Sequence, residues 1–224
     1  MGIKTFKHVD YLWDEKKALE LGDDQVALFL YRSNILGSDL RITNYGGGNT
    51  SCKTIEKDPL TNEEVEVMWI KGSGGDIGTL TRSGIAGLYT ERLRNLKKVY
   101  KGLHDEDRMV GLFNHCIYDL DSRAPSIDTP LHGLLPFKHI DHLHPDALIA
   151  VAAAKDSEKV TKEIWGDTMG WVRGEAHRAT LVQTLRVTLP APPASPSEPA
   201  TPQRPPRAPC CPALPSLARA WQEQ

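Results

Sequence analysis

The chain has 224 residues, of which 25% are charged and 40% hydrophobic, and its formal net charge is -2. These values describe an ordinary globular protein of one or two domains, without the basic excess of a nucleic-acid binder. No apolar run approaches the roughly 20 residues that span a bilayer, and the first residues lack the apolar stretch of a signal peptide. The 4 cysteines show no CxxC spacing, which indicates neither a disulfide framework nor a cysteine zinc site. We therefore expect a cytoplasmic protein that binds neither nucleic acid nor membrane.

The composition changes sharply near Val172. From Arg173 to Gln224 there is no Ile, Phe, Tyr, Asp, Asn, Lys or Met, and Pro, Ala and Arg dominate. Such a segment has too few large apolar residues to offset the entropy of ordering it. It is either a disordered proline-rich tail or GC-rich DNA translated in the wrong frame. We favour the second interpretation, because every missing residue type except Asp has AT-leaning codons. We predict a domain over residues 1–172 and a tail over residues 173–224.

Residues 1–172 alternate between helical and strand-like patterns. Residues 23–37 place apolar side chains at helical spacing between a possible cap, Asp23 or Asp24, and a terminating Gly37. Residues 40–55 are typical of a strand, a glycine loop and a second strand. The other patterns predict a strand at 65–72, helices at 83–100 and 105–120, a short strand at 139–144 and a helix at 145–155. Strands in a run with helices around them indicate a mixed, layered α/β domain.

Histidines cluster in the stretch FKHIDHLHPDA, residues 137–147. In a strand, His142 and His144 point to the same face, because side chains alternate. Two converging imidazoles suit a divalent transition metal such as zinc, which in catalytic sites takes three protein ligands and leaves one position open. His139 has the opposite parity and is not expected to be a ligand. The alternative is a pair of solvated histidines, and the pattern alone does not separate the two.

A carboxylate precedes these histidines in the stretch APSIDTPLHGLL. If Ser126 caps a helix, Asp128 lies in its first turn and His132 lies one turn further on the same face. Asp128 could then act as a general acid or base for a substrate held at the metal. The alternative is that the carboxylate only complements the helix dipole.

Two glycine-rich turns, YGGGNTSCK and IKGSGGDIG, each follow a predicted strand. Neither matches the phosphate loop or the dinucleotide fingerprint, which disfavours nucleotide binding. Glycine allows backbone N–H groups to form an anion nest, to which Ser51, Ser73 and Lys71 could add donors and a positive charge. Each loop alone could be a plain tight turn. Together they indicate a small phosphorylated substrate.

The stretches GGGNTSCK, KGSGGD and SIDTPLHGLLPFKHIDHLHPDA occur here in the order found in the class II aldolase/adducin family. In detail the chain resembles the aldolase half of bifunctional rhamnulose-1-phosphate aldolase/lactaldehyde dehydrogenases over about residues 1–172. The resemblance implies a layered α/β/α fold, a homotetramer, and zinc-dependent retro-aldol cleavage of a phosphorylated ketose. The products would be dihydroxyacetone phosphate and L-lactaldehyde.

The resemblance also assigns roles to particular residues. Asp128 lies where many members have a catalytic glutamate, and His142 and His144 match the first two zinc ligands. The residues that match the phosphate-binding loops are Asn49, Ser51, Ser73 and Gly74.

The chain departs from the family after residue 172. The third zinc histidine normally lies in a late strand before a His-Gly pair, and His177 lacks that context. We therefore expect a domain that is incomplete at its C-terminal side. The alternative function is a catalytically inactive fragment, or an adducin-like assembly module, because loss of a ligand weakens metal binding. A sugar-phosphate epimerase or dehydratase of the same superfamily is a third option.

Overall fold

The structure is a computed structural model, and it describes residues 10–102, 106–173 and 179–182. The chain divides into two compact units, the first extending to Ala150 and the second beginning at Val151. Each unit is described by itself. Among the described residues no helix is both long and apolar enough to cross a bilayer.

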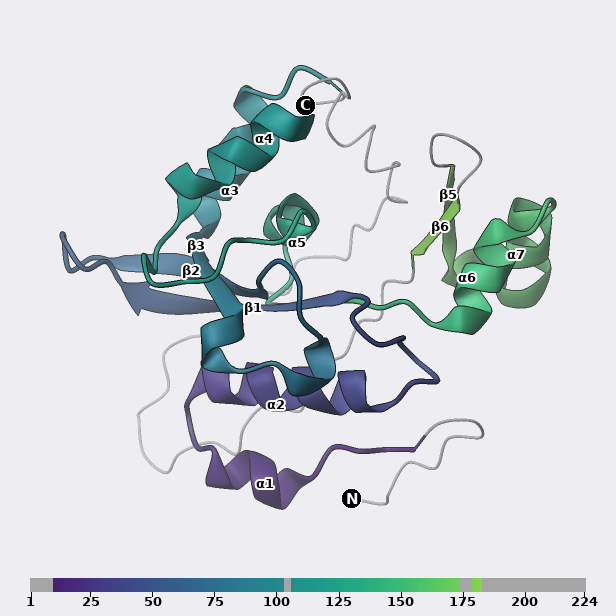
Figure 1. Ribbon diagram of the computed structural model, residues 1–224, viewed down its shortest axis with the longest axis horizontal. Helices are drawn as coiled ribbons and strands as arrows, with labels where there is room; N and C mark the ends of the chain where they lie inside the picture. The colour runs from purple at the N-terminus through teal and green to yellow at the C-terminus, as the bar shows by residue number, and fades with distance from the viewer. Residues whose placement is uncertain (1–9, 103–105, 174–178, 183–224) are drawn as a thin grey trace, which may run out of the picture. The chain divides into compact units, whose positions relative to one another are not determined.

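The first unit is built on a four-stranded antiparallel sheet with the order β3-β2-β1-β4 (Figure 1). Strands β1 and β2 form a long hairpin, and β4 pairs with only the first part of β1. In that register Asn49 lies opposite His142, so the two side chains share one face of the sheet. The strands are β1 (Asn49–Lys57), β2 (Glu64–Lys71), β3 (Ile85–Tyr89) and β4 (His139–His142).

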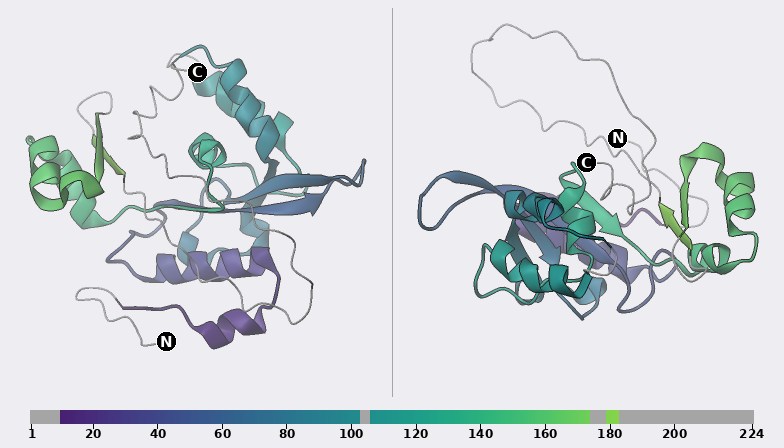
Figure 2. Two further views of the ribbon diagram at one scale, coloured as in Figure 1. Left: turned by 180° about the vertical axis from the view of Figure 1, so that it is seen from behind. Right: turned by 90° about the horizontal axis from the view of Figure 1, so that it is seen from above.

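Helices cover both faces of this sheet, which gives three layers (Figures 1 and 2). Helix α2 lies against one face, and α3 and α5 lie on the other. The helices are α1 (Glu15–Glu20), α2 (Gln25–Ser38), α3 (Thr90–Asn95), α4 (Glu106–Leu112) and α5 (Thr129–Leu134). Short 3-10 turns occupy Ile77–Thr79, Arg82–Gly84, Leu96–Lys98 and Phe113–Cys116. The predicted layered α/β/α architecture is confirmed.

Two apolar clusters, one on each face of the sheet, hold the layers together. The α2-side cluster includes Phe29 and Cys52, which are 1% and 0% exposed. The cluster on the other face includes Met68, Leu88 and Leu93, all at most 1% exposed. Burial of a large aliphatic or aromatic side chain stabilises the fold by roughly 1.5–3 kcal/mol. The clusters explain why the second half of β2, residues 67–70, and strand β3 read as apolar runs.

The second unit contains α7 (Ser157–Trp165), a 3-10 turn (Gly166–Thr168) and a two-stranded sheet. Helix α6 (Asp146–Ala153) spans the division between the units. Strand β5 (Gly170–Arg173) pairs antiparallel with β6 (Ala179–Val182), and Trp171 Nε1 donates to Ser157 Oγ at 2.9 Å. Strand β6 lies within the segment predicted as a tail. The other residues of that segment beyond Arg173 lie outside the described ranges.

Several details of the predicted elements are wrong, including the helix predicted at 105–120, in which α4 ends at Leu112 and a 3-10 turn follows. Residues 40–42 are a turn and residue 43 is irregular, where a strand was predicted, because Asp39 accepts from Arg41 N at 3.0 Å and so competes with strand pairing. The pattern at 83–100 begins as strand β3 and becomes helical only at Thr90. Gly37 does not end α2 by its conformation. It allows close packing, since a Cβ there would lie 2.0 Å from Gly78 N.

Candidate active site

The two predicted metal histidines meet at the end of β4. The strand ends at His142, so His144 follows it instead of belonging to it. The rings still converge, with the two Nε2 atoms 3.1 Å apart and the ring centroids 4.8 Å apart. Burial and the neighbouring His142 lower the pKa of His144, which favours the neutral imidazole that binds metals. His139 points to the other face, and burial lowers its pKa to about 4.

Asp128 lies behind His142 at the N-cap position of α5, where its side chain makes no capping hydrogen bond. Its Oδ1 atom is 3.6 Å from His142 Nδ1, and its Oδ2 accepts from Ser126 Oγ at 3.1 Å. Interaction with His142 holds the pKa of Asp128 well below its usual range, so the carboxylate is ionised. At this distance the carboxylate attracts the imidazole without a hydrogen bond to it, and His142 Nδ1 is buried without a hydrogen-bond partner among the described residues. The carboxylate is the N-cap residue of α5, not a first-turn residue as predicted.

Asn49 connects Asp128 to the second glycine loop. Its Nδ2 donates to Asp128 Oδ2 at 3.4 Å and to Lys71 O at 3.3 Å. Its Oδ1 is buried and has no hydrogen-bond partner among the described residues. A buried acceptor without a donor is costly, so this atom is suited to a donor on a bound ligand.

The first glycine loop brings the backbone against β4. Gly48 has a φ of 76°, and a Cβ on it would lie 2.4 Å from His142 O. Gly46 N donates to Asp76 Oδ1 at 2.8 Å, and Gly78 N donates to Asp76 Oδ2 at 2.8 Å. Asp76 therefore ties the two glycine loops together. Sequence reasoning missed this residue, whose only local signal is an acid placed directly after a glycine run.

The second glycine loop, residues 71–75, lies at the end of β2 next to Asn49. Lys71 is 4% exposed, and its Nζ donates to Gly74 O at 3.4 Å and Gly75 O at 3.2 Å. Burial lowers the pKa of Lys71, while the carboxylates of Asp128 and Asp76 oppose this shift. Ser73 and Gly74 are exposed at the tip of the loop. The loop therefore surrounds a buried ammonium with backbone carbonyls.

Ser51 and His132 lie in the interior instead of at the site surface. Ser51 Oγ and His132 Nδ1 are 2.7 Å apart, and both residues are 0% exposed. Burial lowers the pKa of His132 to about 3, so its imidazole is neutral. The structure therefore links five of the predicted site residues through direct contacts, namely Asn49, Lys71, Asp128, His142 and His144. Ser73 and Gly74 lie in the exposed part of the loop after Lys71, and Ser51 is buried against His132.

The donor set fits a metal ion only in part. His142 and His144 offer two converging nitrogens, which suits zinc. Within residues 10–102, 106–173 and 179–182, no group of three His, Cys, Asp or Glu side chains is placed to hold one ion. His177, which lacks the sequence context of the family's third ligand, lies outside the described residues.

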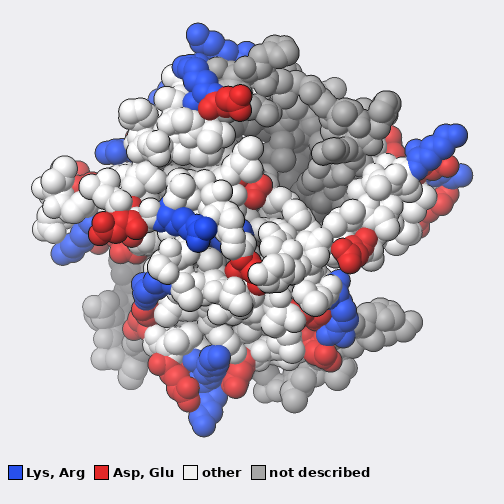
Figure 3. Space-filling model, in the orientation of Figure 1, with Lys and Arg blue, Asp and Glu red and all other residues white. Residues whose placement is uncertain are grey.

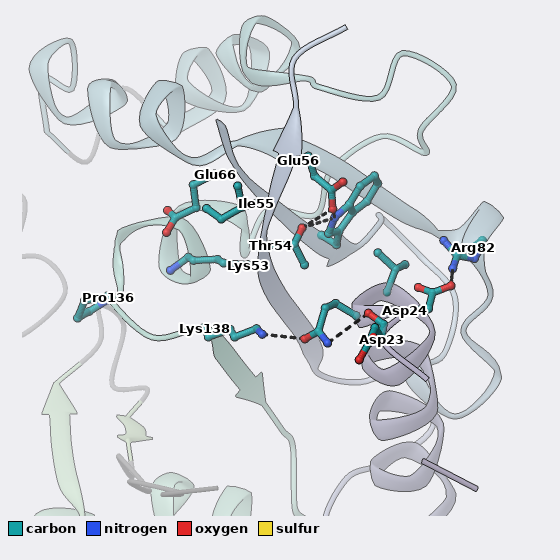
Figure 4. A pocket seen from close by; sticks show the side chains of 13 residues that line it. Asp23, Asp24, Lys53, Thr54, Ile55, Glu56, Glu66, Arg82, Pro136 and Lys138 are labelled. Carbon is teal, nitrogen blue, oxygen red and sulfur yellow. Dashed lines mark hydrogen bonds and ion pairs between the residues drawn. The ribbon is translucent and has the colours of Figure 1, made fainter. Parts of the chain in front are cut away.

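A pocket of about 720 Å³ lies elsewhere in the first unit, at the end of β1 beyond its pairing with β4 (Figure 4). Lys53 and Glu66 line one part of it, and Thr54 and Glu56 line another. None of the predicted site residues lines this pocket. We assign the site to the histidine cluster, because chemistry depends on converging functional groups and not on volume alone. On the face drawn in Figure 3, basic and acidic side chains are interspersed.

The fold and the site define a layered α/β domain with a histidine–carboxylate pair beside a cation-containing glycine loop. Residues 30–190, more than half of the chain, match the family described as Class II Aldolase and Adducin N-terminal domain. The chain belongs to this family. The match includes residues 173–190, which belong to the segment predicted as a tail.

Two similar proteins were found. The uncharacterized oxidoreductase YuxG of Bacillus subtilis (strain 168) is 42% identical over 164 residues, which are 73% of this chain and 23% of that protein. A solved structure, the N-terminal class II aldolase domain of a conserved protein from Thermoplasma acidophilum, matches with a TM-score of 0.56 and 30% identity. That match covers 62% of this chain and 64% of the other. The chain thus spans less than two thirds of each.

Proposed function

We propose that this domain catalyses a retro-aldol cleavage of a ketose 1-phosphate with the help of zinc. The substrate that follows from the resemblance is rhamnulose 1-phosphate, and the products are dihydroxyacetone phosphate and L-lactaldehyde. The observation that carries the proposal is the convergence of His142, His144 and ionised Asp128 beside the 71–75 loop. Family membership supports an aldolase activity of this general type.

The proposal assigns a role in binding or catalysis to each of these residues. His142 and His144 hold the zinc ion, which when bound supplies Lewis-acid stabilisation of the negative charge that develops on the substrate. Asp128 accepts the proton of the hydroxyl group whose carbon becomes the aldehyde. It later returns a proton to the carbon freed when the C3–C4 bond breaks. The 71–75 loop anchors the phosphate, so that binding free energy is used for orientation.

Purification of the full chain, followed by zinc analysis and a dihydroxyacetone phosphate release assay, tests the proposal. We expect near-stoichiometric zinc in the wild type and a loss of zinc affinity of about 100-fold or more in His142→Ala and His144→Ala. Asp128→Asn should lose cleavage by about 100-fold while it loses less zinc affinity. The exposed His115→Ala variant is the matched control. Release of aldehyde from fuculose 1-phosphate at an equal rate would contradict the choice of rhamnulose 1-phosphate.

The alternative is a non-catalytic assembly module of the same family. It is favoured by the lack of a third ligand among the described residues. A purified wild type that contains no zinc and cleaves no ketose phosphate, but forms a stable oligomer, would support this alternative and contradict the aldolase.

A further inference from the structure

Arg123 lies across the second glycine loop. A Cβ on Gly72 would lie 2.9 Å from Arg123 Cβ, and one on Gly74 would lie 3.4 Å from Arg123 Nη2. The backbone on either side is fixed, because Arg123 N donates to Ile85 O at 3.3 Å and Ala124 O accepts from Ser73 N at 2.8 Å. The absence of a side chain on Gly72 is what allows the arginine to cross the loop. Its guanidinium therefore reaches the exposed tip while its stem follows the loop backbone.

The two cations of this loop have different positions. Lys71 is buried under the loop, whereas Arg123 is exposed above it. Among the described residues, neither cation has a carboxylate oxygen within the 4.0 Å of an ion pair. Burial lowers the pKa of Lys71, the carboxylates of Asp128 and Asp76 oppose this shift, and the charge of Arg123 adds to it to a lesser degree. Two positive charges at one loop, of which that of Lys71 is partly offset by the carboxylates of Asp128 and Asp76, favour an anionic ligand.

The loop backbone also has N–H groups that donate to no acceptor among the described residues. Gly72 N and Ser73 N are occupied, donating to Gly84 O at 2.9 Å and Ala124 O at 2.8 Å. Gly74 and Gly75 have φ angles of 70° and 79°, and their N–H groups have no partner among the described residues. Unoccupied N–H groups in such a turn form an anion-binding nest.

We propose that Arg123 is the side chain that contacts the substrate phosphate. Lys71 is instead a positioning residue that holds the loop carbonyls from below. A guanidinium presents two parallel N–H groups to two phosphate oxygens, whereas a buried ammonium pointing at carbonyls acts only through the loop. The inference deepens the proposed function, because it rests on a phosphorylated substrate.

The test is a calorimetric titration of the full chain with inorganic phosphate at low ionic strength. We expect Arg123→Ala to weaken phosphate binding about 10- to 100-fold without a change in melting temperature, because one charged hydrogen-bonding group is lost. Arg123→Lys should recover part of this loss of affinity, since lysine restores the positive charge but not the two parallel N–H groups of the guanidinium. Lys71→Met should lower both phosphate affinity and melting temperature, as expected for a residue that supports the loop. Arg94→Ala, which removes an exposed arginine from α3, is the matched control and should bind like the wild type.

Each outcome decides the inference. Wild-type phosphate affinity in Arg123→Ala, or no phosphate binding by the wild type, would overturn it. Equal losses in Arg94→Ala would also overturn it, because the effect would then reflect net charge alone. Zinc content and ketose cleavage, measured on the same samples, separate this inference from the proposed function. Arg123-dependent phosphate binding in a protein without zinc or cleavage would sustain the inference and contradict the aldolase.

Discussion

Lys53 shows how one buried charge is accommodated in the sheet. The residue is 5% exposed in β1, and its Nζ donates to Leu135 O and, at 3.1 Å, to Phe137 O. Burial lowers the pKa of Lys53 from an ordinary 10.5 to about 8. The ammonium thus connects the sheet to the segment that leads into β4, at a cost in desolvation.

This shift predicts a pH-dependent stability. The unfolded chain holds the Lys53 proton up to about pH 10.5 and the folded chain only to about 8, so the unfolded state binds more protons between these values. The cost of burying the charged Lys53 therefore lowers the stability of the fold in full below about pH 8, and this cost disappears as the pH rises to 10.5. Relative to Lys53→Met, the wild type should gain up to about 3 kcal/mol of unfolding free energy across this window. Urea denaturation at several pH values checks this, and the exposed Lys98→Met variant should show no such trend. A difference in unfolding free energy between the wild type and Lys53→Met that does not change with pH would contradict the lowered pKa of Lys53.

At the scale of elements, the first glycine loop sets the position of β4 relative to β1. Gly46 and Gly48 both have left-handed φ angles, of 71° and 76°. A Cβ on Gly46 would meet nothing within 4 Å, whereas one on Gly48 would lie 2.4 Å from His142 O. A comparison of substitutions at the two glycines therefore distinguishes the cost of a left-handed backbone, present at both, from the cost of the steric contact with β4, present only at Gly48.

We expect Gly46→Ala to cost about 1–2 kcal/mol of unfolding free energy, the cost of a left-handed alanine. Gly48→Ala should cost at least about 2 kcal/mol more, because the loop must also move away from β4. It should further weaken zinc binding, since His142 is the residue displaced. Denaturant unfolding and zinc titration of both variants measure these effects. Equal costs in the two variants would show that the contact with His142 O is not important.

At the scale of the whole first unit, the sheet separates two apolar clusters. Phe29 belongs to one cluster, and Leu88 and Leu93 belong to the other. Substitutions on opposite faces share no partners, so their effects should add, while neighbours in one cluster should couple.

We predict that Phe29→Leu and Leu93→Val each cost about 1 kcal/mol and that the double variant costs their sum within about 0.5 kcal/mol. The pair Leu88→Val and Leu93→Val, within one cluster, should deviate from the sum by more. Chemical denaturation of the single and double variants provides both cycles. Strong coupling between Phe29 and Leu93 would indicate that the two clusters act as one core.

The elements that the sequence predicts well are those stabilised by nearby residues. Helix α2 begins where Asp24 Oδ1 accepts from Ala27 N at 2.9 Å, an interaction within one turn. The prediction failed at residues 40–43, where an apolar pattern typical of a strand is overruled by the hydrogen bonds of Asp39. Strand β3 was missed because it depends on pairing with another strand and not on local hydrogen bonds. Its register beside β2 depends on residues that lie far along the chain.

The sequence by itself determined the layered α/β class, the HxH histidine pair, the glycine loops and the family, because each is encoded in residues close together in the chain. Only the tertiary structure decided which of these residues meet. It placed Asn49 opposite His142 through strand pairing, buried Ser51 against His132, and laid Arg123 across the 71–75 loop. These contacts join segments separated by dozens of residues, and their geometry follows from strand register and packing, which no local pattern specifies.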